Sequence, residues 1–238
     1  MILAPYNVDV PMERWPIANW CLMAFTIAIS IDAFSGTMLF EGLQVWMMHG
    51  GGVWATDAGL LGNIFTHADP LHLLGNMMFL FVFGNAVNAK LGQALFLSCY
   101  VALGIISGQL FALFFPDAVG LGASGAIAGI TGMFIVFFPK NNVSIFFGML
   151  LLFRPIGKTF QVSAWLVIGA YFLKDLAFQI LESTTGAESG VALMAHLGGT
   201  VAGVLIAAAL LVTLRVVPGK YETTLVDLAR ERMQSKSA

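Results

Sequence analysis

A serine and a histidine lie in two small-residue stretches far apart in the sequence, and together these side chains could carry out hydrolysis. Ser124 lies in GLGASGAIAG at residues 120–129, and His196 lies in VALMAHLGG at residues 191–199. A serine hydroxyl becomes an effective nucleophile when a neighbouring imidazole removes its proton. No Asp or Glu lies near either residue within its own apolar stretch. We therefore predict a Ser/His dyad that transfers acyl groups, provided that the fold brings the two side chains together.

A second polar group, in HADPLHLLGNM at residues 67–77, could stabilise the negative charge that forms on the attacked carbonyl oxygen. His72 and Asn76 are four residues apart and therefore share one face of a helix. We expect His72 and Asn76 to bind this oxyanion, with His67 as a further candidate. The backbone N–H of Ser124, at a helix start, is another expected donor.

The composition indicates that these residues are positioned by membrane-spanning helices. The 238-residue chain is 58% hydrophobic and only 10% charged, with a mean hydropathy of +0.87. Soluble domains carry about 25% charged residues. The net charge of −2 and the absence of a basic stripe argue against nucleic acid as a partner. Cys21 and Cys99 lie in apolar runs and are expected to pack as small hydrophobic residues.

Hydrophobic runs predict an all-α, polytopic membrane protein with six spans. The expected spans are residues 16–34, 71–89, 93–115, 124–139, 162–181 and 191–217. The fourth is short, and its neighbour at 146–155 could extend it, lie at the interface or re-enter the membrane. We divide the chain into a short N-terminal segment, a membrane domain and a tail, at residues 1–15, 16–217 and 218–238.

Positive charges predict the orientation of the bundle. With the N-terminus in the cytoplasm, all the Lys and Arg residues except Lys174 lie on or beside cytoplasmic segments. The outer connections at residues 35–70, 116–123 and 182–190 contain neither Lys nor Arg. The N-terminus lacks the features of a removable signal, so the first span is expected to be an uncleaved anchor.

Small residues are expected to join spans four and six. Spans two, four and six all begin on the outer side, which puts their polar residues at one depth. Faces of Gly, Ala and Ser let two helix backbones approach closely in lipid. We expect this contact to bring Ser124 within reach of His196. The glycines expected there are Gly122, Gly125, Gly129, Gly199 and Gly203.

The combination of three motifs resembles the rhomboid family of intramembrane serine proteases. The motifs are GASG at residues 122–125, AHLGGTVAG at 195–203 and the H-x4-H-x3-N pattern at 67–76, and the similarity extends over residues 36–203. The resemblance implies a six-helix bundle in which Ser124 is the nucleophile and His196 the base. It also implies that His72 and Asn76 hold the oxyanion. Single-pass membrane proteins would be cut at small residues near the outer face, without a metal or organic cofactor.

Three departures from the family pattern raise structural questions. A Trp-Arg pair common in the first loop is replaced around residues 59–61. An aromatic residue that many members carry four positions after the serine is Ala128 here, so another group must orient His196. A glutamate common after span two is Asn88, which could change how spans two and three are tied together.

The polar residues also have alternative interpretations. Metal binding by His67 and His72 is disfavoured because a five-residue spacing suits two ligands on one helix poorly. His49 is expected to be an exposed loop residue. Lys174 and Asp175 in span five are expected to snorkel or to find polar partners in a structural pairing, although adjacent helical residues face about 100° apart and cannot simply neutralise each other. A proton relay through that pair remains an alternative.

We therefore expect a serine endopeptidase in a bacterial-type cytoplasmic membrane, with both termini in the cytoplasm. It would cleave transmembrane segments of membrane proteins near the outer face. The alternative is a catalytically inactive rhomboid-like protein that binds membrane proteins or serves in their quality control. A small-solute transporter is a weaker option, because no matching halves or broken helix pair are visible.

Overall fold

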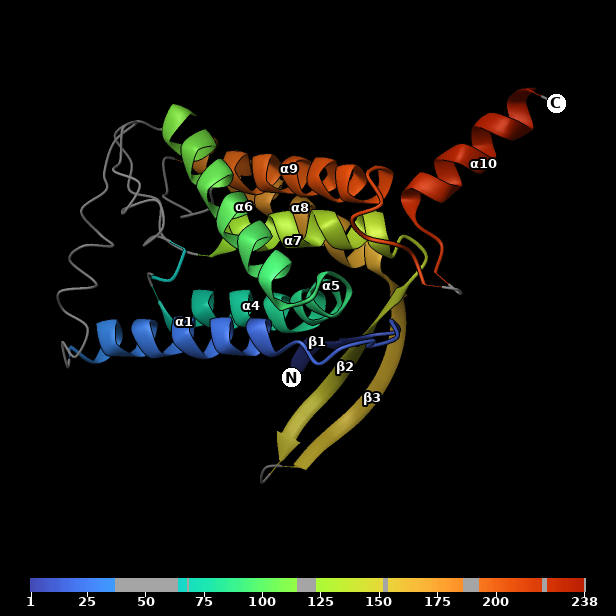
Figure 1. Cartoon of the computed structure of the whole chain (residues 1–238). Helices are drawn as coiled ribbons and strands as arrows, with labels where there is room; N and C mark the ends of the chain where they lie inside the picture. Colours follow the sequence, from blue (N-terminus) through green and yellow to red (C-terminus); the bar gives the residue numbers. More distant parts are fainter. Residues whose placement is uncertain are drawn as a thin grey trace.

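The computed structural model is a bundle of long apolar helices with a small sheet at one end (Figure 1). It describes residues 1–36, 64–67, 69–114, 123–151, 154–185, 193–219 and 222–237. Within these residues, five helical stretches are long and apolar enough to cross a membrane. They are α1 (Ile17–Ser35), the stretch Pro70–Leu91, α6 (Gln93–Phe114), the part Ala164–Leu181 of α8 (Ala164–Thr185), and α9 (Leu193–Val212).

The fourth expected span forms α7 (Ser124–Phe137), a helix of only 14 residues. Every residue of α7 is buried, and the helix packs against α6 and α9. Because the other helices enclose α7, it makes its contacts with protein and does not need the length of a lipid-facing helix. The helical membrane bundle expected from the sequence is present, with five long helices and this short central one.

The second span changes its winding in the middle. It consists of α4 (Pro70–Phe79), the π-helical segment η1 (Leu80–Gly84) and α5 (Asn85–Leu91). Asn19 of α1 donates from its side-chain amide to the carbonyl oxygen of Leu80 at 2.9 Å. A polar side chain of a neighbouring helix thus pairs with a backbone carbonyl of the π-helical turn.

Asn88, which stands where the family often has glutamate, joins span two to α1. Its side-chain oxygen accepts a hydrogen bond from the backbone N–H of Asn19 at 3.0 Å. The neighbouring Gln93, at the start of α6, accepts from the backbone N–H of Ala18 at 2.7 Å. The first turn of α1 is therefore fastened to both spans two and three by side-chain amides.

A three-stranded antiparallel sheet, which the sequence reading did not predict, lies at one end of the bundle. It consists of β1 (Ile2–Val8), β2 (Asn142–Leu151) and β3 (Arg154–Ser163), in the order β1-β2-β3. The described residues of the ambiguous segment, 146–151 and 154–155, thus belong to two paired β-strands and not to a helix. Gly148 and Gly157 oppose each other on the two strands, and the ring of Phe146 packs over both.

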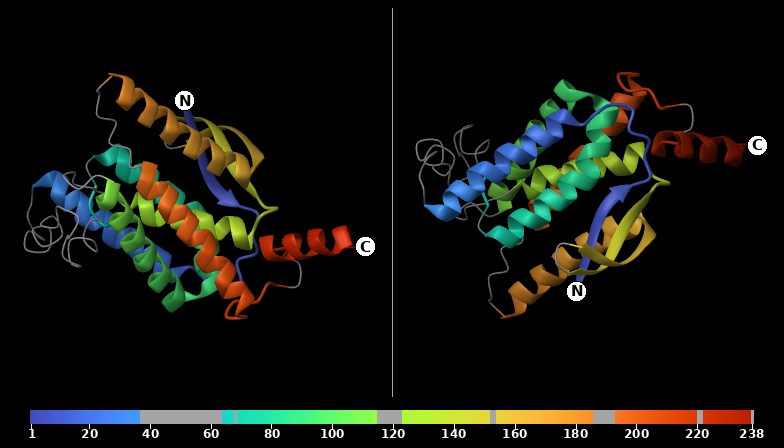
Figure 2. Two further views of the ribbon diagram at one scale, coloured as in Figure 1. Left: turned by 90° about the horizontal axis from the view of Figure 1, so that it is seen from above. Right: turned by 90° about the horizontal axis from the view of Figure 1, so that it is seen from below.

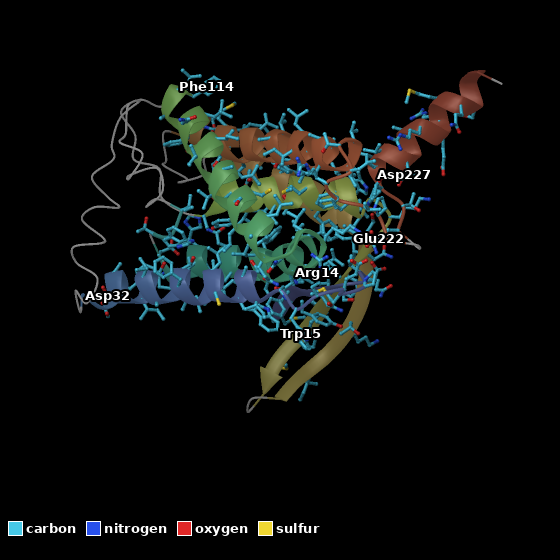
Figure 3. All side chains as sticks on the ribbon, viewed as in Figure 1. Arg14, Trp15, Asp32, Phe114, Glu222 and Asp227 are labelled. Carbon is cyan, nitrogen blue, oxygen red and sulfur yellow. The ribbon has the colours of Figure 1, made fainter. Side chains whose placement is uncertain are left out.

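The tail is attached to the bundle through a buried ion pair. Lys90, near the end of α5, pairs with Glu222, which precedes the last helix, α10 (Leu225–Ser237). Glu222 also accepts a hydrogen bond from the backbone N–H of Gly219 at 2.7 Å. Figure 3 shows Glu222 and Asp227 where the tail leaves the bundle. Thr224 and Asp227 cap the start of α10: the backbone N–H of Thr224 donates to the Asp227 carboxylate at 3.0 Å, and the backbone N–H of Asp227 donates to the Thr224 hydroxyl oxygen at 3.2 Å.

Candidate active site

Ser124 and His196 lie at adjoining ends of two helices that run side by side in the same direction (Figure 1). Ser124 is the first residue of α7, and His196 lies in the first turn of α9. Both side chains are buried. A carbon atom added at Gly199 would strike the carbonyl oxygen of Gly125, and one added at Gly203 would strike that of Gly129.

This register advances by four residues on each helix, so α7 and α9 are parallel and their starts are neighbours. The predicted glycine contact therefore lies where the two candidate residues require it. Gly125 begins the contact one residue after Ser124, and Gly199 begins it three residues after His196. Thr200 adds a hydrogen bond across the contact, from its hydroxyl to the carbonyl oxygen of Ala128 at 3.1 Å. Gly122 and His49, and the first-loop residues 59–61, lie outside the described residues.

A carboxylate contacts His196, and the expectation that none lies nearby is wrong. Asp175 of α8 is completely buried, and its Oδ2 lies 2.6 Å from Nδ1 of His196. Neither of the spans that hold Ser124 and His196 contains an Asp or Glu. The carboxylate comes from a third helix, α8, which could not be placed from the motifs alone.

Lys174 and Asp175 also pair with each other, although adjacent residues of a helix face about 100° apart. Nζ of Lys174 lies 3.0 Å from Oδ1 of Asp175, an ion pair without hydrogen-bond alignment. The two backbone positions face apart, but the four-carbon side chain of lysine is long enough to fold back. The Lys174 ammonium also lies over the ring of Tyr171, 4.7 Å from its centroid.

The ring of Tyr171 packs beside that of His196, so two residues of α8, Tyr171 and Asp175, contact the histidine, while Ala128 stands where many members of the family carry an aromatic residue. The centroids of the two rings are 5.7 Å apart, with 37° between their planes. Tyr171 and Asp175 are four residues apart and share one face of α8. An i, i+4 pair of an aromatic and an acid in an apolar span was the available signal in the sequence.

His67 uses both of its ring nitrogens within the protein. Nδ1 lies 3.1 Å from the hydroxyl of Ser30 on α1, and Nε2 lies 2.9 Å from the amide nitrogen of Asn76 on α4. Burial, and to a lesser degree the charge of His72, lowers the pKa of His67 to about 4. The neutral ring therefore accepts from the Asn76 amide at Nε2 and donates from Nδ1 to Ser30. His67 thus links Ser30 on α1 to Asn76 on α4.

His72 and Asn76 are positioned by the start of α4. Asp69 caps this helix by accepting from the backbone N–H groups of Leu71 and His72, both at 2.8 Å. His72 is partly exposed, and its ring meets that of His67 edge to face at 5.4 Å. No three His, Cys, Asp or Glu side chains in the described part of the chain gather closely enough to hold a metal ion.

The ring nitrogen of His196 that does not contact Asp175 is Nε2. Nε2 of His196 is buried and has no hydrogen-bond partner among the described residues. The first N–H groups of α7, including that of Ser124, have no partner within the helix and lie at its positive end. The neighbouring starts of α7 and α9 thus carry a hydroxyl, an imidazole whose Nε2 has no partner among the described residues, and the unpaired N–H groups of a helix start.

Comparison with known proteins identifies the same family as the three sequence motifs. The family model described as the Rhomboid domain matches residues 50–213, which is more than half of the chain. Rhomboid protein 1, mitochondrial, of Saccharomyces cerevisiae is 30% identical over 177 residues, covering 68% of this chain and 44% of that protein. The putative rhomboid protease YdcA of Bacillus subtilis is 34% identical over 150 residues, covering 62% of this chain and 64% of that protein.

A second protein of Bacillus subtilis, the rhomboid protease GluP, is 30% identical over 151 residues, covering 63% of this chain and 25% of that protein. The chain thus spans between 25% and 64% of the length of these three relatives. The matched region contains Ser124, Asp175 and His196 together with the helices that hold them. From this match and the helical bundle that it covers, the chain belongs to the rhomboid family of integral, multi-pass membrane proteins.

Proposed function

We propose that this protein is an intramembrane serine endopeptidase in which Ser124 is the nucleophile and His196 the general base. The observation that supports the proposal is the glycine contact between α7 and α9, whose register makes the starts of the two helices neighbours, together with a His196 Nε2 that is unpartnered among the described residues. Two relatives whose names include rhomboid protease support the same activity.

The chemistry follows from these roles. Oγ of Ser124 attacks the carbonyl carbon of a peptide bond while Nε2 of His196 takes the hydroxyl proton. The oxyanion that forms receives hydrogen bonds from the backbone N–H of Ser124 and from side chains at the start of α4. His196 then gives its proton to the leaving amine, and a water molecule hydrolyses the acyl-enzyme by the same route.

Asn76 and His72 supply the side-chain donors for the oxyanion in this proposal. One N–H of the Asn76 amide is engaged by His67, which leaves the second N–H for the substrate. His67 therefore serves the site by holding Asn76 in place, and it does not itself donate to the oxyanion. Loss of one oxyanion donor typically lowers turnover by about 10²- to 10³-fold.

The proposed substrates are single-pass membrane proteins, cut in or near their transmembrane segments at the outer face. Ser124 and His196 lie at the starts of their helices and not at mid-helix, which gives water the shortest path to the acyl-enzyme. The proposed location is a bacterial cytoplasmic membrane with both termini inside, on the basis of the Lys and Arg distribution.

Labelling with a fluorophosphonate probe tests the proposal directly. The wild-type protein in detergent is expected to react covalently, and Ser124→Ala is expected to abolish the reaction. Cleavage of a single-pass reporter protein in proteoliposomes should be lost in the same variant. A folded wild-type protein that neither reacts with the probe nor cuts the reporter would contradict the proposal and favour an inactive membrane-protein binding factor.

A further inference from the structure

Two side chains of α8, Asp175 and Tyr171, contact the ring of His196. From this arrangement we infer that Asp175 is a positioning residue for the general base, and this inference rests on the proposed function. The serine protease chemistry needs a histidine and a serine, both of which come from the α7–α9 contact. Asp175 reaches His196 from a third helix, α8, and no other carboxylate among the described residues forms a hydrogen bond or ion pair with His196.

The hydrogen bond between Asp175 and His196 selects one form of the ring. A carboxylate oxygen only accepts hydrogen bonds, so the 2.6 Å contact requires the proton of His196 to be on Nδ1. Nε2 of the neutral ring then carries the lone pair. This is the nitrogen without a partner among the described residues, and it is the one that must take the Ser124 proton. Asp175 therefore fixes both the tautomer and the rotation of the ring.

The charge of Asp175 acts when His196 becomes a cation. After Nε2 takes the proton from Ser124, the imidazolium keeps its Nδ1 proton, and the carboxylate stabilises the positive charge without accepting that proton. Asp175 is completely buried, so little water screens this attraction. Lys174, which is half exposed, compensates the same carboxylate from its other oxygen and leaves Oδ2 to the histidine.

The attachment of α8 makes this contact unusual. Figure 2 shows α8 and the sheet at one edge of the bundle in both views. Among the described side chains of α8, only Ala164, Ile168 and Asp175 are buried, along one face of the helix. Asp175 is the last of the three along the chain, and it is the one that contacts His196. The competence of His196 thus depends on α8 staying in place.

The test compares Asp175→Asn with the wild type in the full-length protein. Asparagine keeps the size of the side chain but removes its charge, and its amide can donate to Nδ1 and so stabilise the wrong tautomer. We expect kcat for reporter cleavage to fall by about 10²- to 10³-fold with little change in KM. The rate of fluorophosphonate labelling should fall in parallel. Asp175→Glu, which restores a carboxylate, should recover at least about tenfold over Asp175→Asn.

A matched control separates orientation of the base from simple attachment of α8. Ile168→Ala loosens the same helix face about two turns before Asp175 but leaves the carboxylate intact. If Asp175 acts only as an anchor, Ile168→Ala should reduce kcat as much as Asp175→Asn, and that result would overturn the inference. Equal losses in Asp175→Asn and Asp175→Glu would also overturn it.

Folding defects can be distinguished from catalytic ones, because the labelling rate is measured on the folded molecules and the labelling amplitude counts them. If Asp175→Asn does not fold at all, the difference in kcat between Asp175→Glu and Ile168→Ala decides, with a larger loss in Ile168→Ala contradicting the inference. A wild-type protein that does not label would refute the proposed function itself. Normal labelling of both wild type and Asp175→Asn would refute only the role of Asp175.

Discussion

The two contacts that α9 makes around the candidate site are built in opposite ways. Toward α7 it presents Gly199 and Gly203, and the backbones meet so closely that no side chain fits between them. Toward α8 it presents the polar ring of His196, which contacts a carboxylate and an aromatic ring on a helix that is otherwise largely exposed. Packing therefore sets the distance between nucleophile and base, whereas a polar contact sets the direction in which the base points.

The difference has a physical consequence for each half of the site. A backbone contact depends on shape alone and is lost when a single carbon atom is added. A polar contact tolerates changes in shape but depends on charge and on the presence of both partners. The same histidine is thus subject to two separate requirements, which substitutions can test one at a time.

The largest effect is expected from Gly203→Val, which breaks the packing contact. The new side chain would collide with the backbone of Gly129, which cannot move aside as a flexible side chain would. We expect a loss of about 3 kcal/mol or more in stability, seen as failure to recover folded protein in detergent. Gly169→Ala on α8 is the matched control, because nothing lies within 4 Å of the added carbon there. A folded, active Gly203→Val would show that the α7–α9 contact can be remodelled.

A smaller effect is expected when acid protonates His67. The ring of this residue makes its polar contacts in the neutral form and not as a cation. The unfolded chain binds a proton at this residue below about pH 6.5, whereas its folded-state pKa is about 4. Stability should therefore fall as the pH falls from about 6.5 to about 4, by about 3 kcal/mol at most, and this contribution should change no further below that. Thermal unfolding in detergent across this range measures it.

His67→Ala provides the reference for that experiment. The variant should be less stable than the wild type at neutral pH, and the difference between the two should shrink as the solution is acidified. A difference that stays constant between pH 4 and pH 7 would mean that His67 is not held in its neutral form.

The smallest effect is expected from Lys174→Met, which alters the charged contact from its exposed side. The Lys174 side chain is half exposed, and ion pairs of this kind contribute about 0 to 1 kcal/mol. The hydrogen bond from His196 to Asp175 remains, so we expect kcat to fall by no more than about fivefold. A loss as large as that of Asp175→Asn would show that the lysine, and not the carboxylate alone, determines the orientation of His196.

The helices and the α7–α9 contact could be predicted from the sequence, because both depend on local patterns. Long apolar runs predicted the spans, and glycines at helical spacing predicted where α7 and α9 would meet. The capped start of α4 also has a local cause, since Asp69 and Pro70 are adjacent in the chain. In each case the residues that cause the structure lie within a few positions of each other or repeat with a helical period.

The missed features depend on contacts between distant segments. The role of Asp175 requires knowing that α8 turns one particular face toward His196, and nothing in the spacing of span five fixes that rotation. The hairpin at residues 142–163 was missed because a short run rich in Phe, Leu and Met reads equally well as a helix or a strand. Its pairing partner, β1, lies ahead of the first membrane helix, far from the hairpin in the sequence.

The pairing of β1 with β2 also constrains the order of assembly. The backbone N–H of Asn142 donates to the Asp9 carboxylate at 2.7 Å, across a separation of 133 residues. Strand β1 leaves the ribosome well before β2 exists, so its edge stays open while the first four membrane helices are inserted. The sheet closes only once the hairpin emerges, just ahead of the helix that carries Asp175. Biogenesis thus fastens the beginning of the chain immediately before it delivers the residue that aims the base.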